Sequence, residues 1–211
     1  MTLRSAATAV AFAALLAVQL LPAASLAWRQ TERLHAGRPL LLTVETRDPR
    51  DLLRGEYSVL AYAIGRLQGV PAAAGSACDL AARETCALGP ERTVYVRLAP
   101  DAEGVHRATE VAFERPPGDA PFIAGTVRSG TLVRNGARFG QQTCGQPACL
   151  FGQASYGIET WYGAQGVPAR LDRMARRDIR VEVRVDADGV AVLDGLRVGG
   201  EPFAKTARLW R

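Results

Sequence analysis

The chain has 211 residues, a net charge of +5, 48% hydrophobic residues and 22% charged residues. These proportions are typical of a folded domain and exclude a disordered chain. The positive charge is almost entirely arginine and is dispersed, so the blocks of like charge that mark nucleic-acid-binding arms are absent and no nucleic-acid partner is expected.

The N-terminal segment is apolar and uncharged over residues 6–27, which read AATAVAFAALLAVQLLPAASLA. About 20 apolar residues suffice to span a bilayer. Arg4 before the segment and the small-x-small sequence Ser25-Leu26-Ala27 at its end are also features of a secretory signal peptide. Residues 1–27 are therefore predicted to be a single-pass anchor in the inner membrane or, alternatively, a cleaved signal peptide. In either case the rest of the chain faces the periplasm.

The chain after this segment is predicted to form one mostly β domain. Residues 28–38 continue as a polar juxtamembrane stalk, and residues 39–211 are long enough to bury a core of their own. Residues 39–47 are expected to be the first strand. The sequence Asp48-Pro49-Arg50-Asp51 after it has the form of a helix start. Glu56 to Ile64 then reads as a central strand, because both of its faces are largely apolar.

Four cysteines form two close pairs in the sequence, Cys78 with Cys86 and Cys144 with Cys149. An even cysteine count in an exported protein indicates disulfides, and four cysteines allow three connectivities. The two local pairings are favoured, and each is expected to contribute roughly 2–3 kcal/mol to stability. A zinc site assisted by His35 and His106 is the alternative, although the spacings are not C-x-x-C. No metal or cofactor is expected.

The rest of the domain is dominated by predicted β-hairpins. The segments are a long loop at 65–90, a hairpin of 92–99 with 105–113, a strand or bent pair at 121–134, a short helix between Val167 and Arg177, and a hairpin of 179–185 with 190–198. Both hairpins turn through the sequence D-A-[DE]-G, with glycine at the position that needs positive φ. Asp186 and Asp188 in the second turn offer a calcium alternative, but most ligands of a full loop are missing. The predicted fold class is mainly β, with antiparallel hairpins forming a barrel-like or sandwich domain with one or two short helices, after the N-terminal apolar helix.

No complete catalytic set is visible in the sequence. It has neither a phosphate-binding glycine motif nor a G-x-S-x-G motif with histidine support. Paired carboxylates are available, and their separation would decide their role in hydrolysis. The candidates are Asp48, Asp51, Glu56 and Glu159.

Two motifs carry a resemblance to a known family. Residues 54–62 read RGEYSVLAY after DPRDLL, and residues 156–162 read YGIETWY. The chain resembles the GDYXXLXY family of bacterial proteins in nearly its whole length, including the apolar N-terminus. That family is functionally uncharacterised, and the resemblance implies a multi-pass membrane protein as partner. Glu56 stands where the family usually has aspartate, which favours a structural role for this carboxylate over a tightly held catalytic one.

The candidate binding surface is drawn from these two motifs. Its members are Arg54, Gly55, Glu56, Tyr57, Leu60, Tyr62, Tyr156, Glu159 and Trp161. Tyr57 and Tyr62 lie on opposite faces of an extended segment, so at least one is expected in the core with its hydroxyl satisfied. Glu159 among aromatic residues is expected either to bind a cation or act as an acid, or to pair with an arginine.

The leading functional interpretation is a membrane-anchored, non-enzymatic accessory domain of a multi-pass membrane protein. One alternative is an envelope hydrolase that uses Glu56 and Glu159. The other is a module that binds a small ligand or glycan by stacking on Trp161 and Tyr162.

Overall fold

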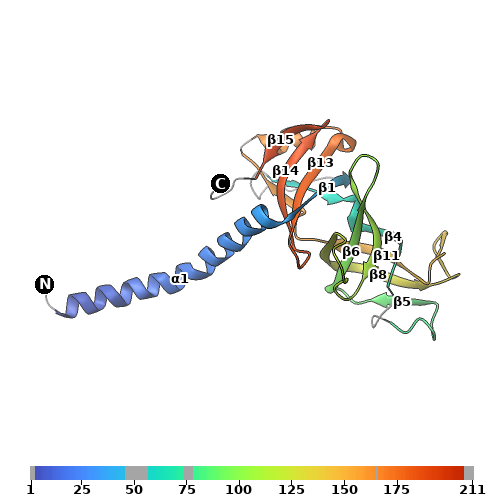
Figure 1. The fold of residues 1–211 in the computed structure, drawn as a ribbon, viewed down its shortest axis with the longest axis horizontal. Coiled ribbons are helices and arrows are strands. Elements are labelled where there is room, and N and C mark those ends of the chain that lie inside the picture. Colours follow the sequence, from blue (N-terminus) through green and yellow to red (C-terminus); the bar gives the residue numbers. More distant parts are fainter. Residues whose placement is uncertain (1–2, 46–56, 74–77, 165, 207–211) are drawn as a thin grey trace.

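The fold is given by a computed structural model that describes residues 3–45, 57–73, 78–164 and 166–206. A long N-terminal helix leads into two antiparallel β-sheets (Figure 1). The chain is therefore mainly β with an N-terminal apolar helix, as predicted. The predicted helix start at residues 48–51 lies outside the described residues.

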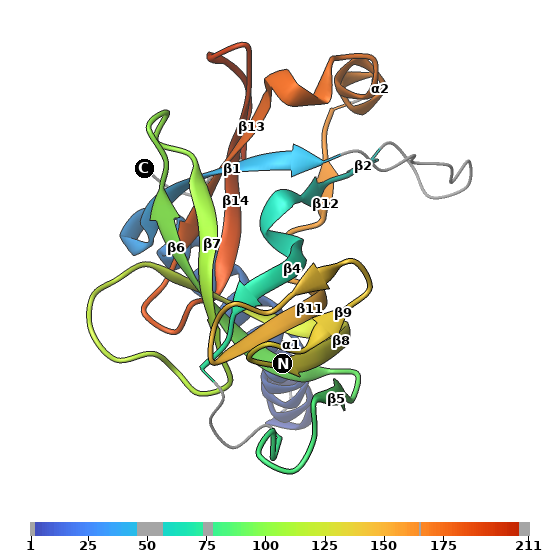
Figure 2. The ribbon, with the colours of Figure 1, turned by 90° about the vertical axis from the view of Figure 1, so that its right-hand side faces the viewer.

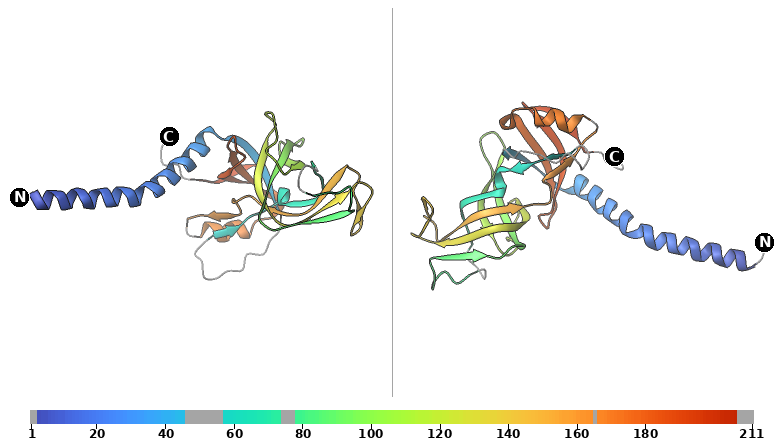
Figure 3. Two further views of the ribbon diagram at one scale, coloured as in Figure 1. Left: turned by 90° about the horizontal axis from the view of Figure 1, so that it is seen from below. Right: turned by 180° about the vertical axis from the view of Figure 1, so that it is seen from behind.

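Helix α1 (Leu3–Ala36) projects away from the sheets over most of its length (Figures 1 and 3). It is rich in alanine and leucine, which favour helix, and its large apolar side chains from Val10 to Leu26 are exposed. Among the described residues, Val10–Ala36 is the one helical segment long and apolar enough to cross a membrane. Its 27 residues extend over roughly 40 Å, compared with about 30 Å for the hydrocarbon core of a bilayer.

The first sheet has five strands in the order β15-β14-β13-β1-β3. They are β1 (Arg38–Glu45), β3 (Ala61–Tyr62), β13 (Ile179–Val185), β14 (Ala191–Val198) and β15 (Glu201–Lys205). In β13, isoleucine and valine alternate with arginine and glutamate, and the apolar side chains are buried while the charged ones are half-buried. This sheet thus buries one face against the core, as the sequence pattern requires.

The second sheet has six strands and curls into a nearly closed barrel (Figure 2). They are β4 (Arg66–Pro71), β5 (Thr85–Leu88), β6 (Arg92–Pro100), β7 (His106–Ala112), β8 (Phe122–Arg134) and β11 (Ala148–Ser155). The order is β4-β11-β8-β6-β7, and β5 pairs with the second half of β8. Ala72, just after β4, bridges to Val111 of β7, and the Ala73 N–H donates to the Val111 carbonyl at 2.8 Å. These contacts draw the two edge strands together and leave little open edge.

Short ribbons and helices complete the fold. They are the pair β2 (Tyr57–Val59) and β12 (Thr160–Tyr162), the pair β9 (Arg138–Phe139) and β10 (Gln142–Thr143), helix α2 (Val167–Asp172), and the 3-10 turns η1 (Ala63–Gly65) and η2 (Arg176–Asp178). One large apolar core spans both sheets, and a second small cluster contains the Cys144–Cys149 disulfide.

The last turns of α1 pack against the first sheet. Thr31 and Leu34 are buried, and Arg33 Nε lies 2.8 Å from Asp186 Oδ2 in the turn between β13 and β14. Gly37 follows the helix directly and lies close to β13, where a Cβ at this position would meet Arg184 Cβ at 2.9 Å and the Val185 backbone nitrogen at 3.2 Å. A side chain at this position is therefore excluded, and the helix end is held in one place on the sheet.

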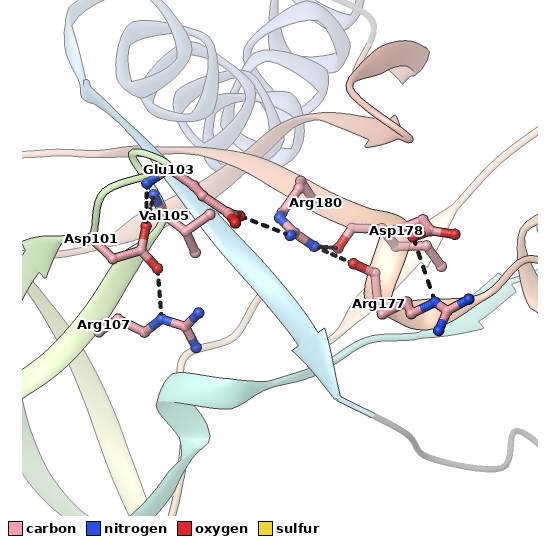
Figure 4. A network of polar contacts seen from close by, with 8 residues as sticks. Asp101, Glu103, Val105, Arg107, Arg177, Asp178 and Arg180 are labelled. Carbon is pink, nitrogen blue, oxygen red and sulfur yellow. Dashed lines mark hydrogen bonds and ion pairs between the residues drawn. The ribbon is translucent and has the colours of Figure 1, made fainter.

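Polar contacts join the two sheets at the turn between β6 and β7 (Figure 4). Asp101 Oδ1 accepts the N–H groups of Glu103 and Val105, each at 3.0 Å, which fixes the turn. Arg180 in β13 then reaches the Glu103 carboxylate at 3.4 Å. Since Glu103 is largely exposed, this ion pair adds little stability and mainly orients the turn.

His106 links the barrel to β1. Its Nδ1 accepts the Leu41 N–H at 3.3 Å, which requires an unprotonated Nδ1. Partial burial lowers the pKa of the His106 imidazole and outweighs the backbone hydrogen bond with Leu41, which raises it; Arg38 lowers the pKa further and Asp101 raises it. The folded state thus favours the neutral imidazole more strongly than the unfolded chain does. The resulting stability is complete above the ordinary histidine pKa of about 6.5 and is lost as the pH falls through the lowered pKa.

We expect acidification from about pH 7.5 to about pH 5 to lower the melting temperature through His106, because the folded state binds the proton less readily than the unfolded chain. In His106→Asn the amide oxygen keeps an acceptor near the Leu41 N–H and does not titrate, so this part of the pH dependence should disappear. Circular dichroism melts of the full chain in detergent measure the effect. His35→Asn, at an exposed position of α1, is the control and should keep the wild-type response. An unchanged pH response in His106→Asn would contradict the prediction.

The structure confirms both predicted hairpins, as β6–β7 and β13–β14, and both local disulfides. The prediction of a long loop over residues 65–90 is wrong for two segments, because Arg66–Pro71 forms β4 and Thr85–Leu88 forms β5. Each of these strands has only one fully buried position, so neither shows the apolar alternation that reveals a strand.

Two further predicted elements differ in extent. The single central strand expected from Glu56 to Ile64 is divided among its described residues, because β2 pairs with β12 while β3 pairs with β1. A segment that changes partners cannot stay one straight strand. The helix expected between Val167 and Arg177 ends at Asp172, after which the chain continues into η2.

Candidate functional site

The two sequence motifs lie side by side in the structure. β2 from the first motif pairs with β12 from the second, with Tyr57 opposite Tyr162 and Val59 opposite Thr160. The contact continues where the Leu60 N–H donates to the Glu159 carbonyl at 2.7 Å. Of the predicted site residues, Arg54, Gly55 and Glu56 lie outside the described residues, as do Asp48 and Asp51.

Two buried tyrosines tie the motifs together reciprocally. The Tyr62 hydroxyl, from the first motif, donates to the Ile158 carbonyl at 2.8 Å. The Tyr156 hydroxyl, from the second, donates to the Ile64 carbonyl at 2.6 Å. Burial raises the pKa of both hydroxyls above its usual value, and the nearby Glu159 raises it further, so both stay protonated donors. The expectation that one motif tyrosine belongs to the core is confirmed for Tyr62.

Glu159 is held in place by its own loop. Its Oε1 accepts the Tyr156 N–H at 2.5 Å, which closes the turn between these two residues. No arginine of the described residues forms an ion pair with it. The carboxylate therefore acts as a turn acceptor here, a third role beside the two considered from the sequence.

The other aromatic residues of the motifs divide between core and surface. Trp161 is only 7% exposed and belongs to the main core, as do Leu60 and Tyr156. Tyr162, next to it in β12, is 74% exposed, and its ring centroid lies 6.0 Å from that of the half-buried Tyr57. The buried members of the predicted binding surface thus support the site from below, while Tyr57 and Tyr162 remain accessible.

A hollow of about 420 Å³ opens beside Glu159, where the chain passes from β3 of the first sheet into β4 of the barrel. Both motifs line it, together with residues of β4, β8 and β11. Its charged lining residues are Arg66, Arg128 and Glu159. The volume falls within the range of roughly 300–1,000 Å³ that is usual for small-molecule sites.

A β-bulge brings Arg128 to this hollow. In the pairing of β11 with β8, Gln153 lies opposite Ser129 and the next residue, Ala154, lies opposite Val127. Arg128 is therefore the extra residue of the bulge, and a bulge re-aims the side chain that it contains. Neither Arg66 nor Arg128 was identified from the sequence. The one available signal was the consecutive polar pair Arg128-Ser129, which interrupts the alternation of β8.

The metal alternatives find no support in the donor atoms. Both disulfides together engage all four cysteines, so no thiolate is left for zinc. Asp186 accepts the N–H groups of Asp188 and Val190 with Oδ1 and pairs with Arg33 through Oδ2. Its carboxylate thus closes a turn and anchors α1, and within the described residues no group of three or more histidine, cysteine or acidic side chains is placed to hold a metal.

Comparison with known proteins gives one family. A family model described as GDYXXLXY protein matches residues 19–196. This range includes residues 19–27 at the end of the apolar segment, both motifs and all four cysteines. No curated protein and no solved structure matches the chain.

Proposed function

The chain belongs to the GDYXXLXY family, and we propose that it is a non-enzymatic periplasmic domain, anchored in the inner membrane, that serves a multi-pass membrane protein as an accessory. Its apolar N-terminal helix and its disulfides are compatible with a membrane-anchored extracytoplasmic domain.

The junction between α1 and the first sheet is the observation that carries this proposal. The helix continues through Pro22 from its apolar segment into Thr31 and Leu34, which are buried on the domain. The pair of Arg33 with Asp186 and the close contacts at Gly37 fix the helix end further. A domain joined in this way keeps a set orientation to the bilayer, which suits lasting contact with another membrane protein better than a free search for soluble ligands.

Neither the hydrolase alternative nor the stacking of a glycan on Trp161 gains a specific observation. Glu159 is engaged as a turn acceptor by the Tyr156 N–H, and Glu56, the second carboxylate that a hydrolase would need, lies outside the described residues. The glycan-binding alternative relied on stacking by Trp161 and Tyr162, and of these two rings Trp161 is in the core while Tyr162 is exposed.

We expect the full-length chain, purified from native membranes in mild detergent, to retain residues 1–27 and to carry a multi-pass protein in stoichiometric amount. Mass spectrometry of the intact chain and of the copurified proteins measures both. The physical reason is that an anchored, oriented domain meets its partner within the plane of the membrane, where the effective concentration is high.

The matched control replaces residues 1–27 with a signal peptide that is cleaved, which leaves the packed residues of α1 and the barrel unchanged. This soluble form should lose most of the copurified protein. A native protein that is already processed and soluble, or a retained anchor without a stoichiometric membrane partner, would contradict the proposal.

A further inference from the structure

The hollow between the two motifs carries charges of both signs. Arg66 comes from β4, Arg128 from the bulge of β8, and Glu159 from the loop before β12. These side chains reach one hollow from three segments that are far apart in the sequence. Such convergence of opposite charges on a concave surface is typical of a site that orients a polar ligand.

The position of Glu159 in the wall is fixed at two atoms. Its carbonyl oxygen accepts the Leu60 N–H, and its Oε1 accepts the Tyr156 N–H. Its Oε2 accepts no hydrogen bond from a described residue. One carboxylate oxygen is therefore available to a donor that enters the hollow.

The two tyrosines that line the hollow are not available to a ligand in the same way. The hydroxyls of Tyr62 and Tyr156 already donate to backbone carbonyls inside the protein. Their hydrogen bonds fix the backbone that lines the hollow, so a ligand would be recognised by the charged side chains. A lining that is already ordered before binding reduces the conformational entropy that is lost when a ligand binds.

The chemistry of these side chains selects a ligand with two opposite charges. A guanidinium binds a carboxylate through two parallel N–H donors, and a carboxylate oxygen accepts from an ammonium group. A simple anion would be repelled by the carboxylate of Glu159, and a simple cation would be repelled by the guanidinium groups of Arg66 and Arg128. We infer that the hollow binds a small zwitterion of amino-acid or dipeptide size, with its carboxylate on the Arg128 side and its ammonium group on Glu159. This inference goes beyond the accessory role and does not depend on it.

Isothermal titration calorimetry of the full-length chain in detergent tests the inference directly. The probes are L-alanine, D-alanine, and the dipeptide alanyl-alanine in both chiralities. Acetate and methylammonium, which carry only one of the two charges, are the matched controls. We expect saturable binding of at least one zwitterion and none of the controls.

Point variants test whether binding takes place in this hollow. Arg128→Gln and Glu159→Gln should each weaken binding by roughly tenfold or more, because each removes a charge-assisted hydrogen bond. Glutamine at position 159 still offers an oxygen to the Tyr156 N–H, so the fold should be kept, and thermal melts check this. Arg138→Gln, at an exposed position in β9 away from the hollow, should bind like the wild type.

Flat titrations for every zwitterion would overturn the inference, as would wild-type affinity in Arg128→Gln. Binding of acetate as tight as that of alanine would also overturn it, since a simple anion site would then be present. The copurification of a membrane partner is read out separately, so failure of one proposal is distinguishable from failure of the other.

Discussion

Adding a single methyl group at Gly152 is expected to destabilise the barrel by about 3 kcal/mol or more. Gly152 lies in β11 directly opposite Gly130 of β8. A Cβ at position 152 would lie 2.3 Å from the Ser129 carbonyl oxygen and 2.6 Å from the Gly130 Cα. Both are backbone atoms, so no side-chain rotation relieves the clash and two paired strands must separate. A typical domain has only about 5–15 kcal/mol of stability, so the variant should be partly unfolded or poorly expressed.

Urea unfolding of Gly152→Ala, followed by circular dichroism, measures this loss. Gly145→Ala is the matched control, because no heavy atom lies within 4 Å of a Cβ built at Gly145. The control should unfold within about 0.5 kcal/mol of the wild type. Equal stability of the two variants would show that β11 and β8 are not paired in this register.

The same glycine illustrates where prediction from the sequence ends. β13 was predictable because its own alternation of apolar and charged residues encodes a half-buried strand. β11 carries Gly152 and Gln153 in its second half and shows no such pattern. It is a strand because β4 and β8 pair with it on its two sides. Such long-range pairing is not visible in a local window, and strand propensity depends strongly on this context.

The candidate site likewise contains features that a local stretch of sequence encodes and features that depend on pairing between distant segments. The burial of at least one of Tyr57 and Tyr62 followed from the alternation of an extended segment, and the structure shows that the buried one is Tyr62. The pairing of Tyr57 with Tyr162 did not follow, because a single sequence contains no record of which distant segments meet. Arg128 enters the hollow only through a bulge between two strands, and a bulge is a property of the pair. The two motifs therefore pointed to this part of the fold, while Arg66 and Arg128 beside them became apparent only in the structure.

Replacing Trp161 by alanine is expected to destabilise the fold by roughly 3–5 kcal/mol, the usual cost of removing a large buried aromatic side chain. Trp161 lies in the main core, and its neighbour Tyr162 points to the other face of β12 and into solvent. Tyr162→Ala removes an aromatic ring from the same short strand but should cost less than about 1 kcal/mol, since it loses mainly its contact with Tyr57. The pair of variants thus separates burial from aromatic character at adjacent positions.

Urea unfolding of both variants measures the difference, and titration with soluble cell-wall glycan fragments measures any loss of binding. If Trp161 supports the site from the core, Trp161→Ala loses stability, whereas Trp161→Phe, which keeps a buried ring, recovers most of it. If Trp161 instead stacks on a glycan, Trp161→Ala should keep wild-type stability and lose binding, which would restore the glycan-binding alternative. The 7% exposure of Trp161 leaves almost no ring face for a ligand. The first outcome is therefore expected.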